Sequence, residues 1–260
     1  MNWCEASGRP GASCSFGAWY KRRVRVILVG TDTDCGKTTI ACALLRAARG
    51  AGVRALPFKP AASGPEGPDS DPERLLAAAA VPGLTREQVC PLRFAAPVAP
   101  GLAEGDALDM SRWTCLEGQQ EPAALVGVRT ALAELEARYV PDLTVIEGAG
   151  GLWVPMPGGS WLPAWVAGLA AAPVVVGRLG LGTINHCLLT IRGLRQLGLP
   201  PIGFFLTQTR PGDDPSHAHN ERVIAAASGL ECLGVLGHAT GPDDAGWLRE
   251  GAWVRLRSGR

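Results

Sequence analysis

Residues 24–49 constrain the fold of this chain more than any other stretch. They begin with a short run rich in β-branched residues, VRVILV, and pass through a glycine-containing loop, GTDTDCGKTT. They end in a run of Ala, Leu and Arg that stops at Gly50. The first run predicts a buried strand and residues 38–49 predict a helix. A strand, a glycine loop and a helix in this order are typical of α/β proteins that bind phosphate at the start of the helix.

The same alternation continues along the chain. Strands are expected at residues 24–29, 53–58, 142–146, 173–176, 201–206 and 233–236, and further helices at 71–80, 122–138, 160–171, 184–197 and 217–227. Several of these strands are near-continuous apolar runs, which suit a parallel sheet covered on both faces. The predicted fold class is therefore α/β: a doubly wound, mainly parallel sheet with helices on both faces, like that of phosphate-loop NTPases. Ligands bind such sheets at the carboxyl ends of the strands.

Composition narrows the range of functions. The chain has 260 residues, 47% of them apolar, which is enough for one substantial core, so residues 24–260 are expected to form a single domain. Residues 1–23 lack the apolar core of a signal peptide and are interpreted as a poorly ordered leader. Lys and Arg number 25 against 24 Asp and Glu, a balance that favours a small-molecule partner over nucleic acid or a membrane surface.

The cysteines and the hydropathy pattern indicate a cellular location. The eight cysteines form no CxxC pair and no close Cys/His spacing, which argues against a zinc site or a disulfide framework. No apolar run approaches the roughly 18 residues that a membrane span needs. We therefore expect a soluble, cytoplasmic protein with reduced thiols.

The first loop predicts a phosphate-binding site. The common pattern GxxxxGK[ST] requires a glycine where this chain has Thr31, and Gly30 stands one residue too early. The backbone N–H groups around Gly36 suit phosphate, Lys37 suits the β- and γ-oxygens, and the Thr38 hydroxyl suits Mg²⁺. A glycine turn that only caps a helix is the less favoured alternative.

Three further side chains follow strand ends or open a helix. Glu147, followed by GAGG, stands where phosphate-loop enzymes place a metal-binding acid. Lys59 precedes Pro60, which favours an extended conformation and lets the lysine act as a second cation. Asp71 opens a helix and is a third oxygen ligand for the metal. A turn, a solvated lysine and a helix-terminal charge are the respective structural alternatives.

Together these motifs resemble the dethiobiotin synthetase family. Its GTDTxxGKT loop matches residues 30–38, and its KPxxSG, VEGAGG and GLGTINH elements match residues 59–64, 146–151 and 180–186. The resemblance implies ATP- and Mg²⁺-dependent carboxylation and ring closure of 7,8-diaminononanoate with CO₂ to give dethiobiotin, a step of biotin biosynthesis. The reaction passes through a carbamate and a carbamic-phosphoric anhydride. The resemblance also implies a homodimer with the active site near its interface.

The resemblance also implies, by motif position, the following roles for individual residues. The catalytic residues are Lys59, Lys37 and Thr33, and the substrate-binding residues are Ser63, Thr183, Ile184 and Asn185. The ATP-binding residues are Asp34, Cys35, Gly36, Lys37, Thr38, Thr39, Asp71, Glu147, Gly148, Ala149, Gly150, Thr207, Gln208, Gly237, His238 and Ala239. Magnesium is assigned to Thr38, Asp71 and Glu147. Helix capping and packing are the alternative roles of Asn185 and His186.

The chain departs from the family pattern in three places. Thr207 and Gln208 stand where the family has an Asn that reads adenine, which leaves base recognition open. The late proline-containing nucleotide loop is replaced by residues 237–239, and the family's SPH segment becomes AlaProGly at residues 99–101. The loop carboxylates are also unusual near phosphate. Asp32 is expected to hold an ammonium group of the diamine or the loop itself, and Asp34 to lend its backbone to phosphate.

Other functions fit less well. A partner-regulated ATPase switch of the partitioning or septum-positioning type carries a second lysine early in the loop, where this chain has Asp32. The ligase half of a cobyrinate amide synthase expects a fused glutamine-hydrolysing domain, and only residues 237–260 follow the last expected strand. A paralogue that binds nucleotide without turnover is disfavoured because Lys37, Lys59 and Glu147 are all present.

Overall fold

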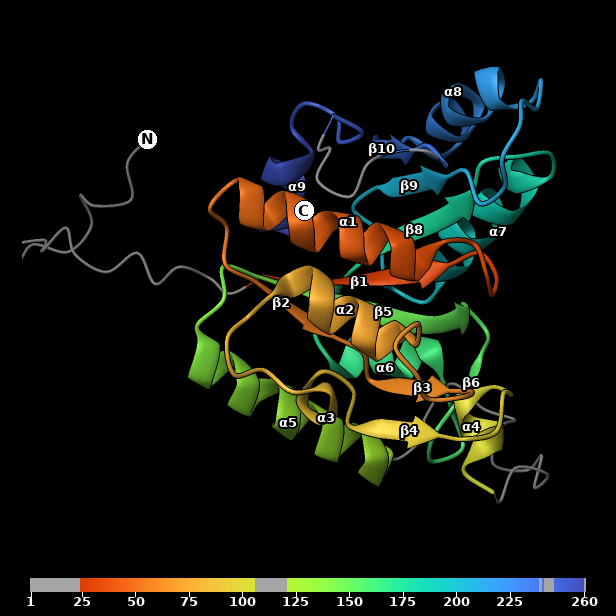
Figure 1. Cartoon of the computed structure of the whole chain (residues 1–260). Helices are drawn as coiled ribbons and strands as arrows, with labels where there is room; N and C mark the ends of the chain where they lie inside the picture. The colour runs from red at the N-terminus through yellow and green to blue at the C-terminus, as the bar shows by residue number, and fades with distance from the viewer. Residues whose placement is uncertain (1–23, 106–120, 239, 241–245, 260) are drawn as a thin grey trace, which may run out of the picture.

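The fold is built around one parallel sheet (Figure 1). The computed structural model describes residues 24–105, 121–238, 240 and 246–259, so the expected leader at 1–23 lies outside the described residues. The six strands of the sheet are β1 (Val24–Gly30), β2 (Ala55–Phe58), β5 (Leu143–Gly151), β8 (Ala172–Arg178), β9 (Phe204–Thr207) and β10 (Cys232–Leu236). Their spatial order is β10-β9-β8-β1-β5-β2, and all neighbouring pairs are parallel.

Helices cover both faces of the sheet. The longer helices are α1 (Lys37–Gly50), α2 (Asp71–Ala79), α5 (Ala123–Tyr139), α6 (Leu162–Gly168), α7 (Thr183–Gln196), α8 (His217–Ser228) and α9 (Ala252–Ser258). In Figure 1, α1 and α2 lie side by side in front of the sheet, and α6 is seen behind β5. The prediction of a doubly wound α/β fold is confirmed.

Short elements surround the carboxyl edge of the sheet. They are β3 (Ala61–Ser63), which pairs in parallel with β4 (Leu92–Phe94), the antiparallel pair β6 (Pro155–Met156) and β7 (Ser160–Trp161), and the short helices α3 (Arg86–Val89) and α4 (Pro100–Ala103). The sequence pattern did not predict any of them, because segments of two to four residues are too short to show a periodicity.

The core lies on both faces of the central strands. Residues 26–29 of β1 and residues 174–176 of β8 are fully buried, as is Trp165 of α6. Burial of each such aliphatic side chain contributes about 1.5–3 kcal/mol to the free energy of unfolding. The central strands therefore form a rigid base whose carboxyl ends hold the loops in place.

The chain reverses its direction of travel across the sheet beside β1. From β1 it goes to β2 and β5 on one side and then crosses to β8, β9 and β10 on the other. Loops that leave neighbouring strands in opposite directions open a crevice at such a point. The glycine loop that follows β1 lies at this crevice.

Strand β5 extends beyond the end that the sequence indicated. Glu147 was expected at the end of a strand covering residues 142–146, but β5 remains paired with β1 as far as Gly151. The register shifts between the Leu28–Glu147 pair and the Gly30–Gly151 pair. Glycine permits this shift, because a Cβ at Gly148 would lie 2.8 Å from the backbone oxygen of Leu28 and Gly150 has φ 45°.

The helix expected at residues 160–171 is wrong at both ends. Ser160 and Trp161 form β7, and α6 covers only Leu162–Gly168. Proline in the first turn of α6 suits a helix start rather than a helix interior. The Ser160 hydroxyl donates to the Pro157 backbone oxygen and accepts from Trp165 Nε1, which holds residue 160 outside the helix.

Two other element boundaries move by a few residues. The strand expected from residue 53 begins at Ala55, and the strand expected from residue 201 is Phe204–Thr207.

In the described part of the chain, no helix is long and apolar enough to cross a membrane.

Candidate active site

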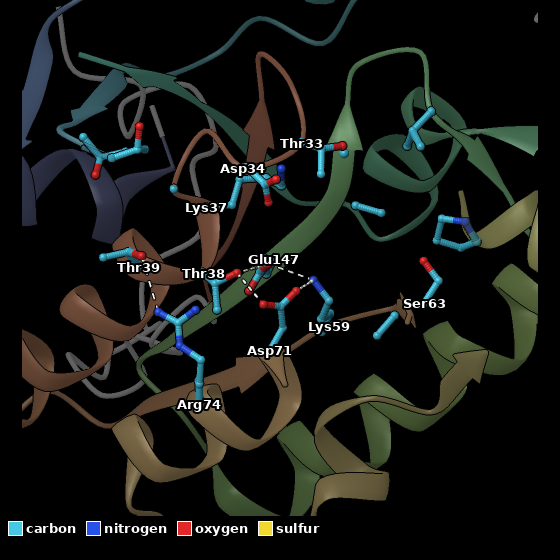
Figure 2. A pocket seen from close by; sticks show the side chains of 18 of the residues that line it. Thr33, Asp34, Lys37, Thr38, Thr39, Lys59, Ser63, Asp71, Arg74 and Glu147 are labelled. Carbon is cyan, nitrogen blue, oxygen red and sulfur yellow. Dashed lines mark hydrogen bonds and ion pairs between the residues drawn. The ribbon is translucent and has the colours of Figure 1, made fainter. Parts of the chain in front are cut away.

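A cavity of about 740 Å³ opens at the carboxyl edge of the sheet, over the crevice beside β1. It brings together most of the residues that the sequence singled out: Thr33, Asp34, Gly36, Lys37, Thr38, Thr39, Lys59, Ser63, Asp71, Glu147, Ala149, Gly150, Thr207, Gln208, Gly237 and His238. Figure 2 shows the labelled members of this set projecting into the space between the glycine loop, the end of β5 and the start of α2. Residues that lie more than a hundred positions apart in the sequence therefore face one cavity.

The glycine loop wraps tightly around the ammonium group of Lys37. Lys37 is only 7% exposed, and its Nζ donates a 2.9 Å hydrogen bond to the Asp32 backbone oxygen. Gly36, with φ 93°, precedes α1. A Cβ at Gly30 would lie 2.7 Å from Lys37 Nζ and 2.6 Å from the Gly150 backbone oxygen, so only glycine fits there. The loop is shaped by these close approaches as much as by its spacing.

Neither carboxylate of the loop, Asp32 or Asp34, forms an ion pair with Lys37, whose Nζ donates instead to the Asp32 backbone oxygen. Asp32 Oδ1 accepts a 2.7 Å hydrogen bond from the backbone N–H of Thr33, which stabilises the turn. Asp34 has φ 55°, a left-handed conformation that Asp and Asn tolerate better than most residues. Both residues are exposed. In this geometry Asp32 holds the loop itself.

A compact charged cluster lies beside the start of α1. Lys59 Nζ lies 2.7 Å from Glu147 Oε1 and 3.0 Å from Asp71 Oδ2. The Thr38 hydroxyl lies 2.8 Å from both Glu147 Oε1 and Asp71 Oδ1. Lys59 and Glu147 are 4% and 1% exposed, so the surface-lysine alternative is wrong. The four side chains come from α1, α2, β5 and the segment after β2, and Figure 2 shows them converging.

The cluster shifts the pKa values of its members. Burial alone lowers the pKa of Lys59, but the charges of Glu147 and Asp71 outweigh burial and raise it above its usual range. Burial raises the pKa of Asp71, but Lys59 and the Thr38 hydroxyl outweigh burial and lower it. Lys59 is therefore held as an ammonium cation and Asp71 as a carboxylate.

The donor set suits a hard divalent cation. Glu147 Oε2 is buried and has no hydrogen-bond partner among the described residues. The Lys59 ammonium group already lies between the carboxylates of Asp71 and Glu147, where a cation is therefore stabilised. Mg²⁺ prefers one or two carboxylates together with hydroxyl, water and phosphate oxygens. In the described part of the chain no group of three or more His, Cys, Asp or Glu could hold a metal, so a cation here needs the Thr38 hydroxyl as well.

Lysine is rare in this chain, a feature of composition that no single motif shows. The whole sequence contains only Lys21, Lys37 and Lys59, although Lys and Arg together number 25. Lys37 and Lys59 both line the cavity and both are buried. Lysine, which is a compact point charge, thus lines the cavity, whereas arginine supplies nearly all other positive charge of the chain.

One end of the cavity has an apolar wall. Pro97, Val98, Ala99 and Pro100 line it together with Val154, and Ser63 lies at the same end. The altered segment at residues 99–101 therefore reaches the cavity through Ala99 and Pro100, although Gly101 does not line it. The sequence did not identify Val154 or Pro97, because single apolar residues in loops carry no motif.

The opposite end holds the residues expected near the nucleotide base. Thr207 is 2% exposed and packs beneath the glycine loop, since a Cβ at Gly36 would lie 2.1 Å from Thr207 Cγ2. Gln208 Nε2 donates a 2.7 Å hydrogen bond to the Gly212 backbone oxygen, and its Oε1 accepts from the His238 N–H at 3.4 Å. In this structure the Gln208 side chain is therefore bound to its own loops.

Some expected residues do not line the cavity. Cys35 is buried behind the loop, and Gly148 packs against β1. Ala239 lies outside the described residues. Thr183, Ile184 and Asn185 start α7, away from the cavity. Thr183 is fully buried and its hydroxyl lies 3.5 Å from Cys187 Sγ, whereas Asn185 is exposed.

Comparisons with known proteins agree with the fold. Residues 24–241 match a family model described as an AAA domain. The chain also resembles the chloroplast FtsY structure from Physcomitrella patens, with a TM-score of 0.53, 17% sequence identity and coverage of 91% of this chain and 65% of that chain. At that identity the likeness shows the fold alone.

Sequence relatives give the family. Over 213 residues the chain is 42% identical to the ATP-dependent dethiobiotin synthetase BioD of Anaeromyxobacter dehalogenans (strain 2CP-C), covering 81% of this chain and 88% of the relative. The enzyme of the same name from Nitrosospira multiformis is 33% identical and is covered to 86%. The chain belongs to the dethiobiotin synthetase family.

The family resemblance suggested by the four motifs is confirmed. The early glycine of the loop, Gly30, has a physical reason in the structure. That glycine is needed where β1 meets the Gly150 backbone and the Lys37 ammonium group. The partitioning ATPase alternative is not favoured.

Proposed function

We propose that this chain uses Mg²⁺ and ATP to carboxylate 7,8-diaminononanoate with CO₂ and to close the product to dethiobiotin. The observation that carries the proposal is the buried Lys59 ammonium group, held by Glu147 and Asp71 beside the Thr38 hydroxyl at the start of α1. The names of the relatives, ATP-dependent dethiobiotin synthetase, support it.

The apolar end of the cavity suits the hydrocarbon chain of the diamine. Val98 and Val154 provide an apolar wall there, and Ser63 provides a hydroxyl near the reacting nitrogens. Thr33, a residue of the glycine loop, also lines the cavity, where its hydroxyl can hydrogen-bond an amine or a carbamate. The diamine would thus lie with its nitrogens close to Lys59.

Bond making and breaking then follow in two displacements. An oxygen of the carbamate formed from one amine and CO₂ attacks the γ-phosphorus, and the bond to the β–γ bridging oxygen breaks as ADP leaves. The second amine attacks the carbonyl carbon of the resulting mixed anhydride, loses a proton, and expels phosphate as the C–O bond breaks. The first step brings two anions together, the carbamate and the triphosphate, and the second develops negative charge on the departing phosphate.

The two lysines oppose that repulsion. Lys37, at the centre of the glycine loop, would neutralise the β- and γ-oxygens, and Lys59 would face the carbamate and the transferred phosphoryl group. Because its carboxylate neighbours hold Lys59 as an ammonium cation, we assign it an electrostatic role rather than that of a base. Thr38, Asp71 and Glu147 would hold Mg²⁺, which supplies further charge neutralisation at the phosphates when bound.

We also propose that the active form is a homodimer. The backbone N–H groups at the start of α7 suit the carboxylate of the substrate, but this helix start does not line the cavity of its own chain. Leu181 and Leu189, at and near this start, are 82% and 60% exposed. A second copy that covers them would place the α7 start of one chain near the cavity of the other.

The test is substrate-dependent phosphate release. We expect the purified protein, with Mg-ATP and bicarbonate, to release phosphate and form a cyclic urea only when the diamine is added. Mass spectrometry of the product distinguishes the urea from the open carbamate. Phosphate release at the same rate without the diamine would contradict the proposal and favour a regulated ATPase.

The Lys59→Ala variant tests the observation that carries the proposal. We expect kcat to fall by about 10²–10³-fold, because the ammonium group acts on charge that develops during transfer. The KM for ATP should change much less. Arg222→Ala on α8 removes an exposed positive charge outside the cavity and is the matched control. An unchanged kcat in Lys59→Ala would remove this residue from the catalytic set.

A further inference from the structure

Arg74 contributes a guanidinium group to the lining of the cavity, and it has no part in the proposed catalytic, metal-binding or substrate-binding roles. It lies on α2, about one helical turn after Asp71. Its Nη2 donates a long hydrogen bond of 3.4 Å to the Thr39 hydroxyl at the start of α1 (Figure 2). Arg74 thus joins the first turns of two helices that pack side by side, at the edge of the proposed nucleotide site.

The charge of Arg74 has no carboxylate partner in the part of the chain that the structure describes. The ion pairs found there involve Lys59, Arg25, Arg54, Arg86, Arg93, Arg129, Arg249 and Arg255, but not Arg74. Both acids of α2 are engaged elsewhere, Asp71 by Lys59 and Thr38 and Glu73 by Arg86. A guanidinium group that presents several N–H donors in a fixed plane is well suited to phosphate oxygens.

The position of Arg74 along the cavity indicates which phosphate it meets. Figure 2 shows Ser63, Lys59, Thr38 and Thr39 in this order across the cavity, with Arg74 below Thr38 and Thr39, far from Ser63. In phosphate loops the lysine of the loop, here Lys37, reaches the β- and γ-phosphates, and the hydroxyl that follows it, here that of Thr38, binds the metal. Because the proposed function places Lys59 at the transferred phosphoryl group, the γ-phosphate belongs on the side of Lys59, and the α-phosphate belongs on the opposite side of Thr38, by Thr39.

We propose that Arg74 and Thr39 form a binding subsite for the α-phosphate of the nucleotide. The guanidinium group donates to non-bridging α-oxygens, and the Thr39 hydroxyl, already within reach of Arg74, donates to the same group. This inference rests on the proposed function, because it requires a nucleotide in the cavity. The subsite makes Arg74 a nucleotide-binding residue, separate from the Lys59 cluster that acts on the transferred phosphate.

Nucleotide titration by calorimetry, without the diamine, tests the proposal. We expect Arg74→Ala to raise the Kd of both Mg-ATP and Mg-ADP by roughly tenfold, because a hydrogen bond to a charged group is lost in each complex. Arg74→Gln, which retains a donor for Thr39 but no charge, should show most of this loss. In the steady state the loss should fall on the KM for ATP rather than on kcat.

Arg46→Ala is the matched control. Arg46 lies on α1, about two helical turns beyond Thr39, and does not line the cavity. Arg46→Ala removes one positive charge from the same pair of helices as Arg74→Ala does. If Arg74 acted only through the long-range electrostatic field of the protein, Arg46→Ala would weaken nucleotide binding as well. We expect its Kd values for both nucleotides to remain within twofold of those of the wild type.

Two results would overturn the subsite. A weaker affinity for Mg-ATP with an unchanged affinity for Mg-ADP would place the contact at the γ-phosphate. Unchanged affinities together with a lower Tm would show that Arg74 only joins α1 to α2. Because the titration needs no diamine, its outcome is independent of the phosphate-release assay: a wild type that binds nucleotide but ignores the diamine contradicts the proposed function alone.

Discussion

The N-termini of α1 and α7 are built alike but differ in what surrounds them. Each helix follows a central parallel strand, β1 or β8, and each is preceded by a glycine with φ 93°, Gly36 or Gly182. Neither has a side-chain hydrogen bond at its N-cap. Both therefore leave backbone N–H groups of the first turn available to an anion, although at α7 the Thr183 N–H already donates to the Gly180 backbone oxygen.

The surroundings decide what each helix start can do. At α1, Glu147 of β5 and Asp71 of α2 reach the Thr38 hydroxyl, and the cavity encloses the loop. At α7, Thr183 is buried against Cys187 and Leu181 is 82% exposed. A strand, a glycine and a helix thus provide an anion site, but the chemistry comes from the elements beside it.

The largest difference in stability is expected between alanine variants of Gly36 and Gly182, the glycines that precede α1 and α7. In Gly36→Ala the new Cβ would lie 2.1 Å from Thr207 Cγ2, so the glycine loop must shift, at a cost of about 3 kcal/mol or more in the free energy of unfolding. In Gly182→Ala the nearest atom is 3.9 Å away, and only the left-handed conformation costs energy, about 1 kcal/mol. Denaturant unfolding of the two variants measures the difference.

The same pair separates packing from nucleotide binding. Gly36→Ala should also lose measurable Mg-ATP binding, because the N–H groups around residue 36 move with the loop. Gly182→Ala should retain it, since this glycine does not line the cavity. Equal losses of stability in the two variants would show that Thr207 yields to the added methyl group and that the two helix starts are equally tolerant.

The sequence predicted the first helix start well because its information is local. The run from VRVILV to GKTT specifies strand, loop and helix within a few residues, and the family motifs identify Lys59, Asp71 and Glu147. It could not show that Glu147 lies within a strand that continues to Gly151, since that depends on pairing with β1 through glycines that tolerate close backbone contact. Long-range pairing leaves no periodicity in a short segment.

The sequence also missed residues whose role depends only on tertiary packing. Arg74 reads as one more charge on a helix surface, and Val154 as one apolar residue in a loop. Both line the cavity because α2 packs against α1 and because β5 turns back at its end. Thr183, Ile184 and Asn185 are the reverse case, because a motif singled them out although they do not line the cavity of their own chain.

An intermediate effect is expected at the exposed face beside α7. If a second copy covers this face, Leu181→Asp and Leu189→Asp should each convert a dimer to a monomer at micromolar concentration, because a charge would be buried against apolar surface. Light scattering coupled to size exclusion measures the mass. The KM for the diamine should rise in the monomer, since the α7 start of the partner is lost.

The control for this prediction is an equally exposed apolar residue elsewhere. Val254 on α9 is 72% exposed, and Val254→Asp should leave the oligomeric state unchanged. A wild-type protein that is monomeric at the same concentration, with full diamine-dependent activity, would contradict the dimer and would leave the α7 helix start without a role in substrate binding.

The smallest expected effect is on the pH dependence of stability and concerns Cys187, whose thiol contacts the Thr183 hydroxyl at the start of α7. Burial raises the pKa of the Cys187 thiol to about 11, and its contact with Thr183 only partly offsets burial. In the unfolded chain the thiol has a pKa of about 8.5, so above that pH the unfolded state loses this proton first and stability falls until the pH reaches the folded pKa. Cys187→Ala should therefore reduce the loss of unfolding free energy between pH 8 and pH 10 by about 2 kcal/mol. Thr190→Ala, on the same helix but without a titrating group, should leave that loss unchanged, and an equal pH dependence in both variants would show that the thiol ionises normally in the folded protein.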